Sequence, residues 1–249
     1  MRSRLKLAGH GPAHVSRLFL AVSSRMMTVT EAVMSRRSVR AFLDTPVPLP
    51  LMEQILAKAS RAASGGNVQP WQVYVVSGEA LRAFKVRMVQ RLAESAEGDL
   101  PVEYHVYPQP LKAPYRDYRF KNGEDYYALA GIPREDKAAR ARFFANNYSF
   151  FGAPLALFCC VDRQMGSPQW SDLGMFLATV MLLLRESGLD SCAQESWSRY
   201  HRTVRQFLNT PEEWMLFCGM AIGYEDREAR INRMVSDRAP LEQFARFLR

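Results

Sequence analysis

The chain has 249 residues, of which 48% are hydrophobic, 11% aromatic and 23% charged, and its formal net charge is +8. This composition excludes a disordered chain, a collagen-like repeat and a disulfide-stapled miniprotein. Charged residues interrupt the longest apolar runs before they reach the roughly 18 residues that a membrane helix needs. We therefore expect a globular protein with no membrane partner.

Much of the positive charge lies at the N-terminus. No acidic residue precedes Glu31, whereas five basic residues do: Arg2, Arg4, Lys6, Arg17 and Arg25. This leader, residues 1–27, could be a targeting peptide, a disordered basic arm, or sequence ahead of a true start at Met26 or Met27. We favour the last interpretation, because Thr28 and Glu31 have the spacing of a capping box. One domain is expected over residues 28–249.

The hydrophobic pattern predicts helices and strands in alternation. In chain order, helices are expected over 28–35, 51–63, 79–95, 133–147, 171–187 and 199–209, and strands over 71–77, 155–161 and 214–222. Residues 98–132 contain several prolines and tyrosines without a clear period, so they are predicted to be a long functional loop. A few strands separated by helices predict an α+β or α/β layered domain.

The cysteines and histidines do not form a recognisable framework. Cys159, Cys160, Cys192 and Cys218 lie outside any CxxC motif, and the four histidines lack the spacing of a zinc site. We therefore expect no metal and a reduced, cytoplasmic chain. His201 is expected to be an exposed helix residue. Because neither GxGxxG nor GxxxxGK[ST] occurs, a Rossmann site or a P-loop is not indicated.

Two arginine clusters are candidates for anion binding. One is Arg36-Arg-Ser-Val-Arg40, and the other holds Arg227, Arg230, Arg233 and Arg238. Guanidinium groups bind phosphate through paired hydrogen bonds, and a serine hydroxyl adds another. Each cluster alone is more typical of a solvated basic surface. The functional interpretation therefore requires that other anion-binding groups lie nearby.

The string Ser64-Gly-Gly-Asn-Val-Gln-Pro-Trp71 is more informative. Paired glycines let the backbone approach another molecule closely. The amides of Asn67 and Gln69 can match the edge of a heterocycle. An ordinary helix end explains one of the glycines but not the whole string.

Five segments together resemble the flavin-dependent nitroreductase family, in the branch that includes nitrobenzoate-type reductases. They are RRSVRAF, SGGNVQPW, FFGAPLALFCCVD, WSDLGMFLATVMLLLRESGLDSCAQES and CGMAIGYEDREARINRMVSDRAPLEQF, and they occur in this order between residues 28 and about 247. The resemblance implies an α+β, three-layer α/β/α fold in an intertwined homodimer, with FMN at the subunit interface. It also implies that Leu241 to Phe247 pack on the partner.

The same resemblance implies an oxidoreductase. It would take hydride from NAD(P)H and reduce a nitroaromatic, quinone or similar acceptor by a ping-pong mechanism. Because the flavin performs the hydride chemistry, no catalytic side chain is expected.

Site residues carried over from the resemblance fall into three groups. The FMN phosphate would be held by Arg36, Ser38 and Arg238, with Arg37 beside them and Arg40 toward the ribityl chain or the pyrimidine end. The partner subunit would contribute Ser64, Gly65, Gly66 and Asn67. A backbone N–H near flavin N5 would come from Gln194, Glu195 or Ser196, where this chain departs from the Pro-x-Glu-Gly of many members.

The sequence of residues 98–132 does not identify the electron acceptor. Tyr115, Tyr118 and Tyr127, with Tyr126, could stack on an aromatic substrate, although ordinary loop tyrosines explain them equally well. The segment could also be the lid of a flavin-destroying or reductive dehalogenating enzyme of the same fold. A basic nucleic-acid-binding protein is the alternative of another class, but no RNP, KH, zinc or helix-turn-helix pattern supports it.

Overall fold

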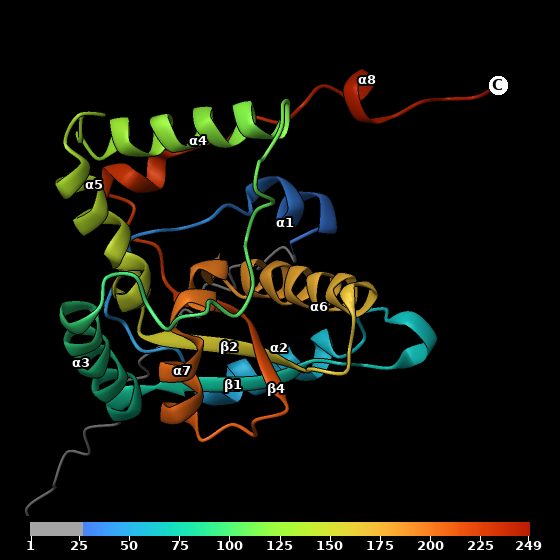
Figure 1. Cartoon of the computed structure of the whole chain (residues 1–249). Helices are drawn as coiled ribbons and strands as arrows, with labels where there is room; N and C mark the ends of the chain where they lie inside the picture. Colours follow the sequence, from blue (N-terminus) through green and yellow to red (C-terminus); the bar gives the residue numbers. More distant parts are fainter. Residues whose placement is uncertain (1–26) are drawn as a thin grey trace, which may run out of the picture.

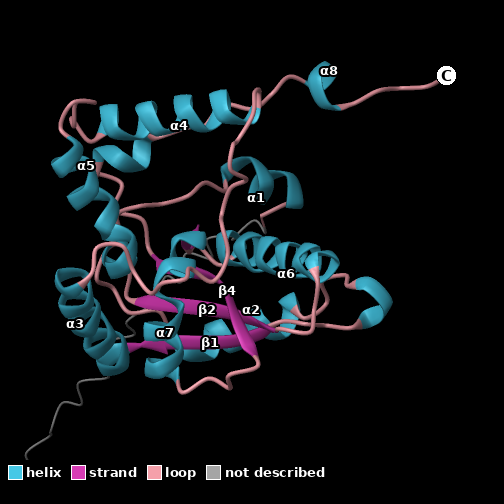
Figure 2. Cartoon of the chain, in the orientation of Figure 1, coloured by secondary structure: helices cyan, strands magenta, loops and turns pink. Residues whose placement is uncertain are grey.

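The computed structural model describes residues 27–249 (Figures 1 and 2). Expectations for the leader concern residues outside this range, apart from Met27. The described residues form one antiparallel sheet with strand order β1-β2-β4-β3. Its strands are β1 (Gln72–Ser77), β2 (Leu155–Asp162), β3 (Asp190–Gln194) and β4 (Trp214–Gly223). Helices lie on both faces of the sheet, which confirms the predicted α+β, three-layer architecture.

The helices follow most of the predicted ranges to within a few residues. They are α1 (Val29–Ser35), α2 (Leu49–Ala59), α3 (Gly78–Glu94), α4 (Tyr115–Leu129), α5 (Lys137–Phe144), α6 (Ser167–Glu186), α7 (His201–Leu208) and α8 (Leu241–Phe244). Helix α1 begins with the expected capping box. The Glu31 N–H donates to Thr28 Oγ1 over 3.2 Å, and the Thr28 N–H donates to Glu31 Oε2 over 2.7 Å.

Two hydrophobic cores lie on opposite faces of the sheet, because successive side chains of a strand point to opposite sides. In β2, Leu155 and Leu157 join the core that contains α2 and α6. Ala156 and Phe158 join the other core, which contains α3 and α7. Strand β2 is buried on both faces, which explains why its sequence is continuously apolar instead of alternating.

A β-bulge interrupts the pairing of β2 with β4. Cys159 pairs with Cys218 and Cys160 with Leu216, so Phe217 is the extra residue. The Tyr104 hydroxyl donates to the carbonyl oxygen of Phe217. Part of the 98–132 segment therefore completes the hydrogen bonding of the sheet.

Three expectations about local structure are wrong. Residues 98–132 are not a continuous loop, because α4 occupies Tyr115–Leu129. Only Tyr126 of α4 is buried, so the helix shows no apolar period. Strand β3 (Asp190–Gln194) is not among the predicted strands. His201 is not exposed, because its side chain keeps 12% of its surface and bonds to Glu103.

No described helix is both long enough and apolar enough to cross a lipid bilayer.

Glu103 connects the 98–114 segment to α7 through a partly buried ion-pair cluster. Its carboxylate accepts from Arg163 Nη1 over 2.6 Å and lies 2.8 Å from His201 Nδ1. Burial raises the pKa of Glu103, but hydrogen bonds and charges from His201 and Arg163 outweigh this and lower it to about 2. A folded-state pKa below the ordinary 4.5 means that this carboxylate stabilises the fold above pH 4.5. The contribution is lost as the pH falls toward 2.

Glu103→Gln is therefore expected to lower the free energy of unfolding at pH 7 by about 1 kcal/mol, which is below the range for buried charged hydrogen bonds because Arg163 is partly solvated. Urea unfolding at pH 7, 5 and 3 measures the difference, which should shrink as the pH falls. A difference that is constant over this range would contradict the ionised role of Glu103.

Candidate functional site

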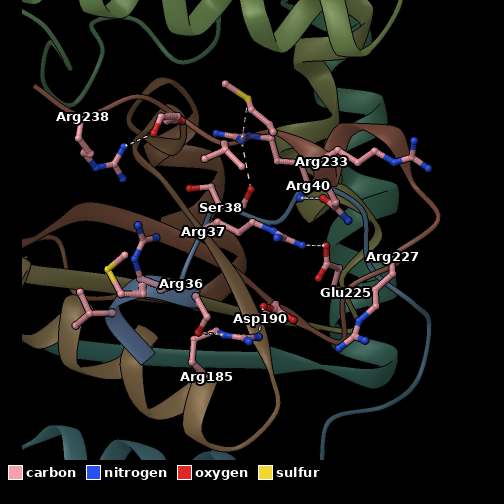
Figure 3. Close-up of a pocket in the computed structure, with 17 residues that line it drawn as sticks. Arg36, Arg37, Ser38, Arg40, Arg185, Asp190, Glu225, Arg227, Arg233 and Arg238 are labelled. Atoms are coloured by element: carbon pink, nitrogen blue, oxygen red, sulfur yellow. Dashed lines mark hydrogen bonds and ion pairs between the residues drawn. The ribbon is translucent and has the colours of Figure 1, made fainter. Parts of the chain in front are cut away.

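A cavity of about 880 Å³ lies where the segment after α1 meets the chain that follows β4 (Figure 3). Arginines dominate its lining: Arg36, Arg37, Arg40, Arg185, Arg227, Arg233 and Arg238. Ser38 and Asn232 also line it, and so do two carboxylates, Asp190 and Glu225. The two arginine clusters singled out in the sequence therefore meet in one place.

The segment of residues 36–40 is extended because α1 ends at Ser35 and Arg36 already has extended backbone angles. Ser38 pairs with Ser191 of β3 as a parallel bridge, and the Val39 N–H donates to the Ser191 carbonyl over 3.0 Å. The Val39 side chain is fully buried. The alternation of a strand then leaves Ser38 and Arg40 on the side away from Val39, facing the cavity.

Asn232 joins this segment to the chain after β4. Its Oδ1 accepts the Arg40 N–H over 2.7 Å, and its Nδ2 donates to the carbonyls of Ala41 and Asp226 over 2.8 and 2.9 Å. Asn232 is buried, so these bonds are protected from water. The two halves of the cavity wall are thereby fixed to each other.

The two carboxylates of the cavity are each paired with an arginine. Arg37 pairs with Glu225, and Arg185 Nη1 lies 2.5 Å from Asp190 Oδ1. Burial raises the pKa of Asp190, and the charge of Arg185 opposes that shift. Within the described lining, five guanidinium groups have no carboxylate partner: Arg36, Arg40, Arg227, Arg233 and Arg238. The cavity is thus suited to an anion.

Five residues that were predicted to bind FMN line this cavity: Arg36, Arg37, Ser38, Arg40 and Arg238. Their roles differ. Arg36 is half-buried and Arg238 exposed. Arg37 is engaged with Glu225, so it holds the wall together. Arg40 donates to the Ser38 carbonyl over 3.3 Å and lies 5.1 Å from the centre of the Tyr126 ring.

The Ser64–Asn67 loop does not line this cavity. The Gly65 N–H donates to Asp172 Oδ1 on α6 over 3.1 Å, and Ser64 Oγ accepts the Gln69 N–H over 3.0 Å. Gly66 has φ +57°, where a side chain would be strained. Hydrogen bonds therefore order this exposed loop, but within a single chain it does not line the same cavity as Arg36.

The predicted N5-side residues follow β3 directly. The Gln194 side chain is occupied, because its Nε2 donates to the Asn147 carbonyl over 2.7 Å and its Oε1 accepts from Trp197 Nε1 over 3.3 Å. Glu195 and Ser196 begin the 3₁₀ turn η3 (Glu195–Tyr200). Partial burial raises the pKa of the Glu195 carboxyl. These residues do not line the arginine cavity in the single chain.

The candidate substrate tyrosines lie on α4, outside the cavity. The Tyr118 hydroxyl donates to Gln243 Oε1 over 2.7 Å. The Tyr127 ring lies 4.4 Å below the Arg140 guanidinium. Tyr115 is exposed. Tyr118 and Tyr127 therefore have contacts within the chain, and the fold gathers none of the three at the cavity.

Two polar residues that organise the candidate site segments, Asn232 and Asp172, are not predicted from the sequence. Asp172 is buried, and its Oδ2 has no hydrogen-bond partner among the described residues. A carboxylate inside the apolar helix WSDLGMFLATVMLLL was a signal, since a buried charge needs a partner. Asn232 gave no comparable signal, because its surroundings in the sequence are polar.

Comparisons with known proteins find similar sequences that cover most of the chain. The family model of the nitroreductases matches residues 33–224. A nitrobenzene nitroreductase of Ectopseudomonas oleovorans is 36% identical over 221 residues, which cover 88% of this chain and 96% of that protein. A 4-nitrobenzoate reductase of Pseudomonas putida is 36% identical over 216 residues, covering 87% and 93%.

Solved structures give the same result. The crystal structure of the FMN- and NADPH-dependent nitroreductase NfnB from sphigopyxis sp. strain HMH has a TM-score of 0.85 and 45% identity, and the match covers 89% of this chain and 99% of that one. The FMN-dependent NfnB of Mycobacterium smegmatis in complex with NADPH has a TM-score of 0.83 and 30% identity, covering 88% and 97%. The resemblance inferred from the five sequence segments is thereby confirmed, and the chain belongs to the nitroreductase family.

Proposed function

We propose that this protein is an FMN-dependent oxidoreductase that takes hydride from NAD(P)H and reduces nitroaromatic compounds. The observation that carries the proposal is the cavity in which Arg36, Ser38 and Arg238 converge in a chain of this family. A phosphate monoester carries nearly two negative charges at neutral pH, so guanidinium groups without carboxylate partners fit it. When bound, FMN supplies the hydride chemistry.

The residues of the chain then have binding and positioning roles. Arg36 and Arg238 bind the phosphate, and the Ser38 hydroxyl adds a hydrogen bond. Arg40 places a positive charge near the pyrimidine end of the flavin. The backbone of Glu195 and Ser196 would lie on the N5 side of the bound flavin. Turnover would follow a ping-pong order, in which NAD(P)H gives up its hydride and leaves as NAD(P)+ before the acceptor, a nitroaromatic or a quinone, takes its place.

Removing the charge of Arg40 is expected to change the redox potential of the FMN-loaded protein. Arg40→Ala should make it more negative by tens of millivolts, since a partly exposed cation contributes about 1 kcal/mol and about 30 mV corresponds to 1.4 kcal/mol for two electrons. Potentiometric titration at saturating FMN measures the shift. Arg40→Lys keeps the charge and should stay near the wild type. Equal potentials in all three proteins would leave Arg40 as an anchor only.

The proposal includes a homodimer, because one chain leaves its site incomplete. The Ser64–Asn67 loop does not line the arginine cavity of its own chain and would complete the site of the partner. Helix α1 exposes Val33 and Met34, and the tail, which extends from the body in Figure 1, exposes Phe244 and Phe247 at 71% and 72%. Apolar surfaces of this kind are typical of obligate interfaces.

Static light scattering of the purified protein is therefore expected to give twice the mass of the 28.4 kDa chain. The mass should stay doubled on dilution, because folded monomer is scarce in an obligate dimer. Truncation before Leu241 removes the tail and should shift the population toward monomer. A monomer that holds one FMN per chain would contradict both the interface and the shared site.

The cofactor and the electron donor are tested together. The purified protein should be yellow, with about one FMN per chain, and anaerobic NADPH or NADH should bleach the flavin absorption. Once the nicotinamide has been removed from the reduced protein, 4-nitrobenzoate alone should restore the flavin absorption. A protein that remains colourless with added FMN would refute the proposal.

The arrangement of the arginines also bears on the nucleic-acid alternative. Duplex binding requires a basic stripe along an exposed face. Here the guanidinium groups converge on a cavity of about 880 Å³, a volume typical of small-molecule sites.

A further inference from the structure

The Arg40 side chain is held by groups that carry no charge. Its Nη1 donates to the Ser38 carbonyl over 3.3 Å and lies 4.0 Å from the Met234 sulfur (Figure 3). Its guanidinium carbon lies 5.1 Å from the centre of the Tyr126 ring, within the range of a cation–π interaction. A carbonyl, a thioether and an aromatic ring therefore contact this half-buried cation.

This arrangement differs from that of two other arginines of the cavity. Arg37 pairs with Glu225 and Arg185 with Asp190, so a carboxylate opposes the charge of each. Among the described residues, Arg40 has no such partner. Neutral partners fix the position of a guanidinium group without cancelling its charge. The charge of Arg40 thus stays available to an anionic group in the cavity.

Tyr126 is the tyrosine of α4 that the fold fixes in place. It is 9% exposed, and its ring centre lies 5.2 Å from those of Tyr127 and Phe143. With Ile231 and Met234 it forms a small hydrophobic cluster apart from the two cores of the sheet. A ring packed on these sides cannot turn away from the guanidinium that it contacts.

The same cluster connects α4 to the wall of the cavity. Met234 directly follows the 3₁₀ turn η4 (Arg230–Arg233), on which α4 packs (Figure 1). Asn232 of that turn accepts the Arg40 N–H over 2.7 Å. The turn thereby fixes the Arg40 backbone, while Tyr126 and Met234 fix its guanidinium group. Burial raises the pKa of the Tyr126 hydroxyl, and the charge of Arg40 opposes this rise, so the ring stays neutral at pH 7.

We propose that Tyr126 is a positioning residue, which holds the Arg40 guanidinium toward the pyrimidine end of the flavin and thereby makes the redox potential of bound FMN less negative. The inference rests on the proposed function, which places FMN in this cavity. Reduced flavin carries negative charge at its pyrimidine end, and a nearby cation stabilises that form. This stabilisation depends on distance, so part of it is lost when the long arginine side chain is free to swing into solvent.

The first test removes the ring. Tyr126→Leu should make the potential of the FMN-loaded protein more negative by roughly a third to a half of the Arg40→Ala shift, because the contacts with Ser38 and Met234 remain. Tyr126→Phe keeps the ring face and should have the wild-type potential. Potentiometric titration at saturating FMN measures both, and urea unfolding checks that each variant is folded.

A double-mutant cycle shows whether Tyr126 acts through Arg40. In the Arg40→Ala background, Tyr126→Leu should cause no further shift of the potential. Tyr127→Leu is the matched control, since it removes the neighbouring ring of the same helix, whose cation partner is Arg140 at 4.4 Å. The potential of this control should equal that of the wild type.

Three results would overturn the proposal: a wild-type potential in folded Tyr126→Leu, an equal Tyr126→Leu shift in the Arg40→Ala background, or an unchanged potential in Arg40→Ala itself. Each would leave the proposed function intact, since FMN would still be bound and reduced. A wild-type protein that takes up no FMN would refute both proposals.

If Tyr126→Leu does not fold, Tyr126→pentafluorophenylalanine decides the question, because it keeps the shape of the ring but makes its face electron-poor. This variant should shift the potential in the same direction as the loss of the ring. A wild-type potential in it would refute the positioning role of Tyr126.

Discussion

Gly219→Ala is expected to destabilise the fold by about 3 kcal/mol or more, at the upper end for overpacking a core. A Cβ at this position in β4 would lie 2.3 Å from Trp197 Cδ1. Trp197 cannot move away, because it is fully buried and stacks on Phe150 with ring centres 4.8 Å apart. Thermal unfolding at fixed protein concentration should show a fall of roughly 6–12 °C, since 1 kcal/mol corresponds to 2–4 °C in a domain of this size.

The same substitution should also affect the site. Trp197 donates to Gln194, which is the register partner of Gly219, so a displaced indole shifts the turn at Glu195 and Ser196. Gly123→Ala is the matched control, because a Cβ on Gly123 in α4 meets nothing within 4 Å. This control should be neutral or slightly stabilising. If the free energy of unfolding of Gly219→Ala lies within 1 kcal/mol of the wild-type value, the Trp197 indole can move to another position and the prediction is wrong.

Arg36→Ala is expected to weaken FMN binding by about 1.5–3 kcal/mol, the range for a hydrogen bond to a charged group. This corresponds to a dissociation constant roughly 10- to 150-fold higher. Titration of the apoprotein, followed by flavin fluorescence, measures it. Excess FMN should restore most of the lost turnover, because the phosphate end is remote from N5.

Two controls accompany this variant. Arg61→Ala removes an exposed arginine after α2 that does not line the cavity, so FMN affinity should be unchanged. Arg36→Lys keeps the charge but loses the paired hydrogen bonds, so its affinity should be intermediate. If Arg36→Ala binds FMN as tightly as Arg61→Ala, the phosphate lies elsewhere in the cavity.

Local pattern determined most of the secondary structure. The capping box at Thr28 and Glu31, the apolar run of β2 and the long helix α6 are each encoded by neighbouring residues, so they could be predicted from the sequence. The order of the segments also identified the family, because RRSVR and SGGN occur at the positions that the family requires. Helix α4 was not predicted, because a helix that buries little more than Tyr126 has no apolar stripe in its sequence.

Only the tertiary structure decided which arginines act together. In the sequence, Arg36 and Arg238 are about two hundred residues apart, and each lies in a cluster that resembles a solvated surface. They meet because Ser38 pairs with Ser191 and because Asn232 holds both Arg40 and Asp226. The structure also separated Arg37 and Arg185, which pair with carboxylates, from the arginines that do not. Charge pairing depends on distances that chain folding sets, and for that reason no pattern of neighbouring residues could show it.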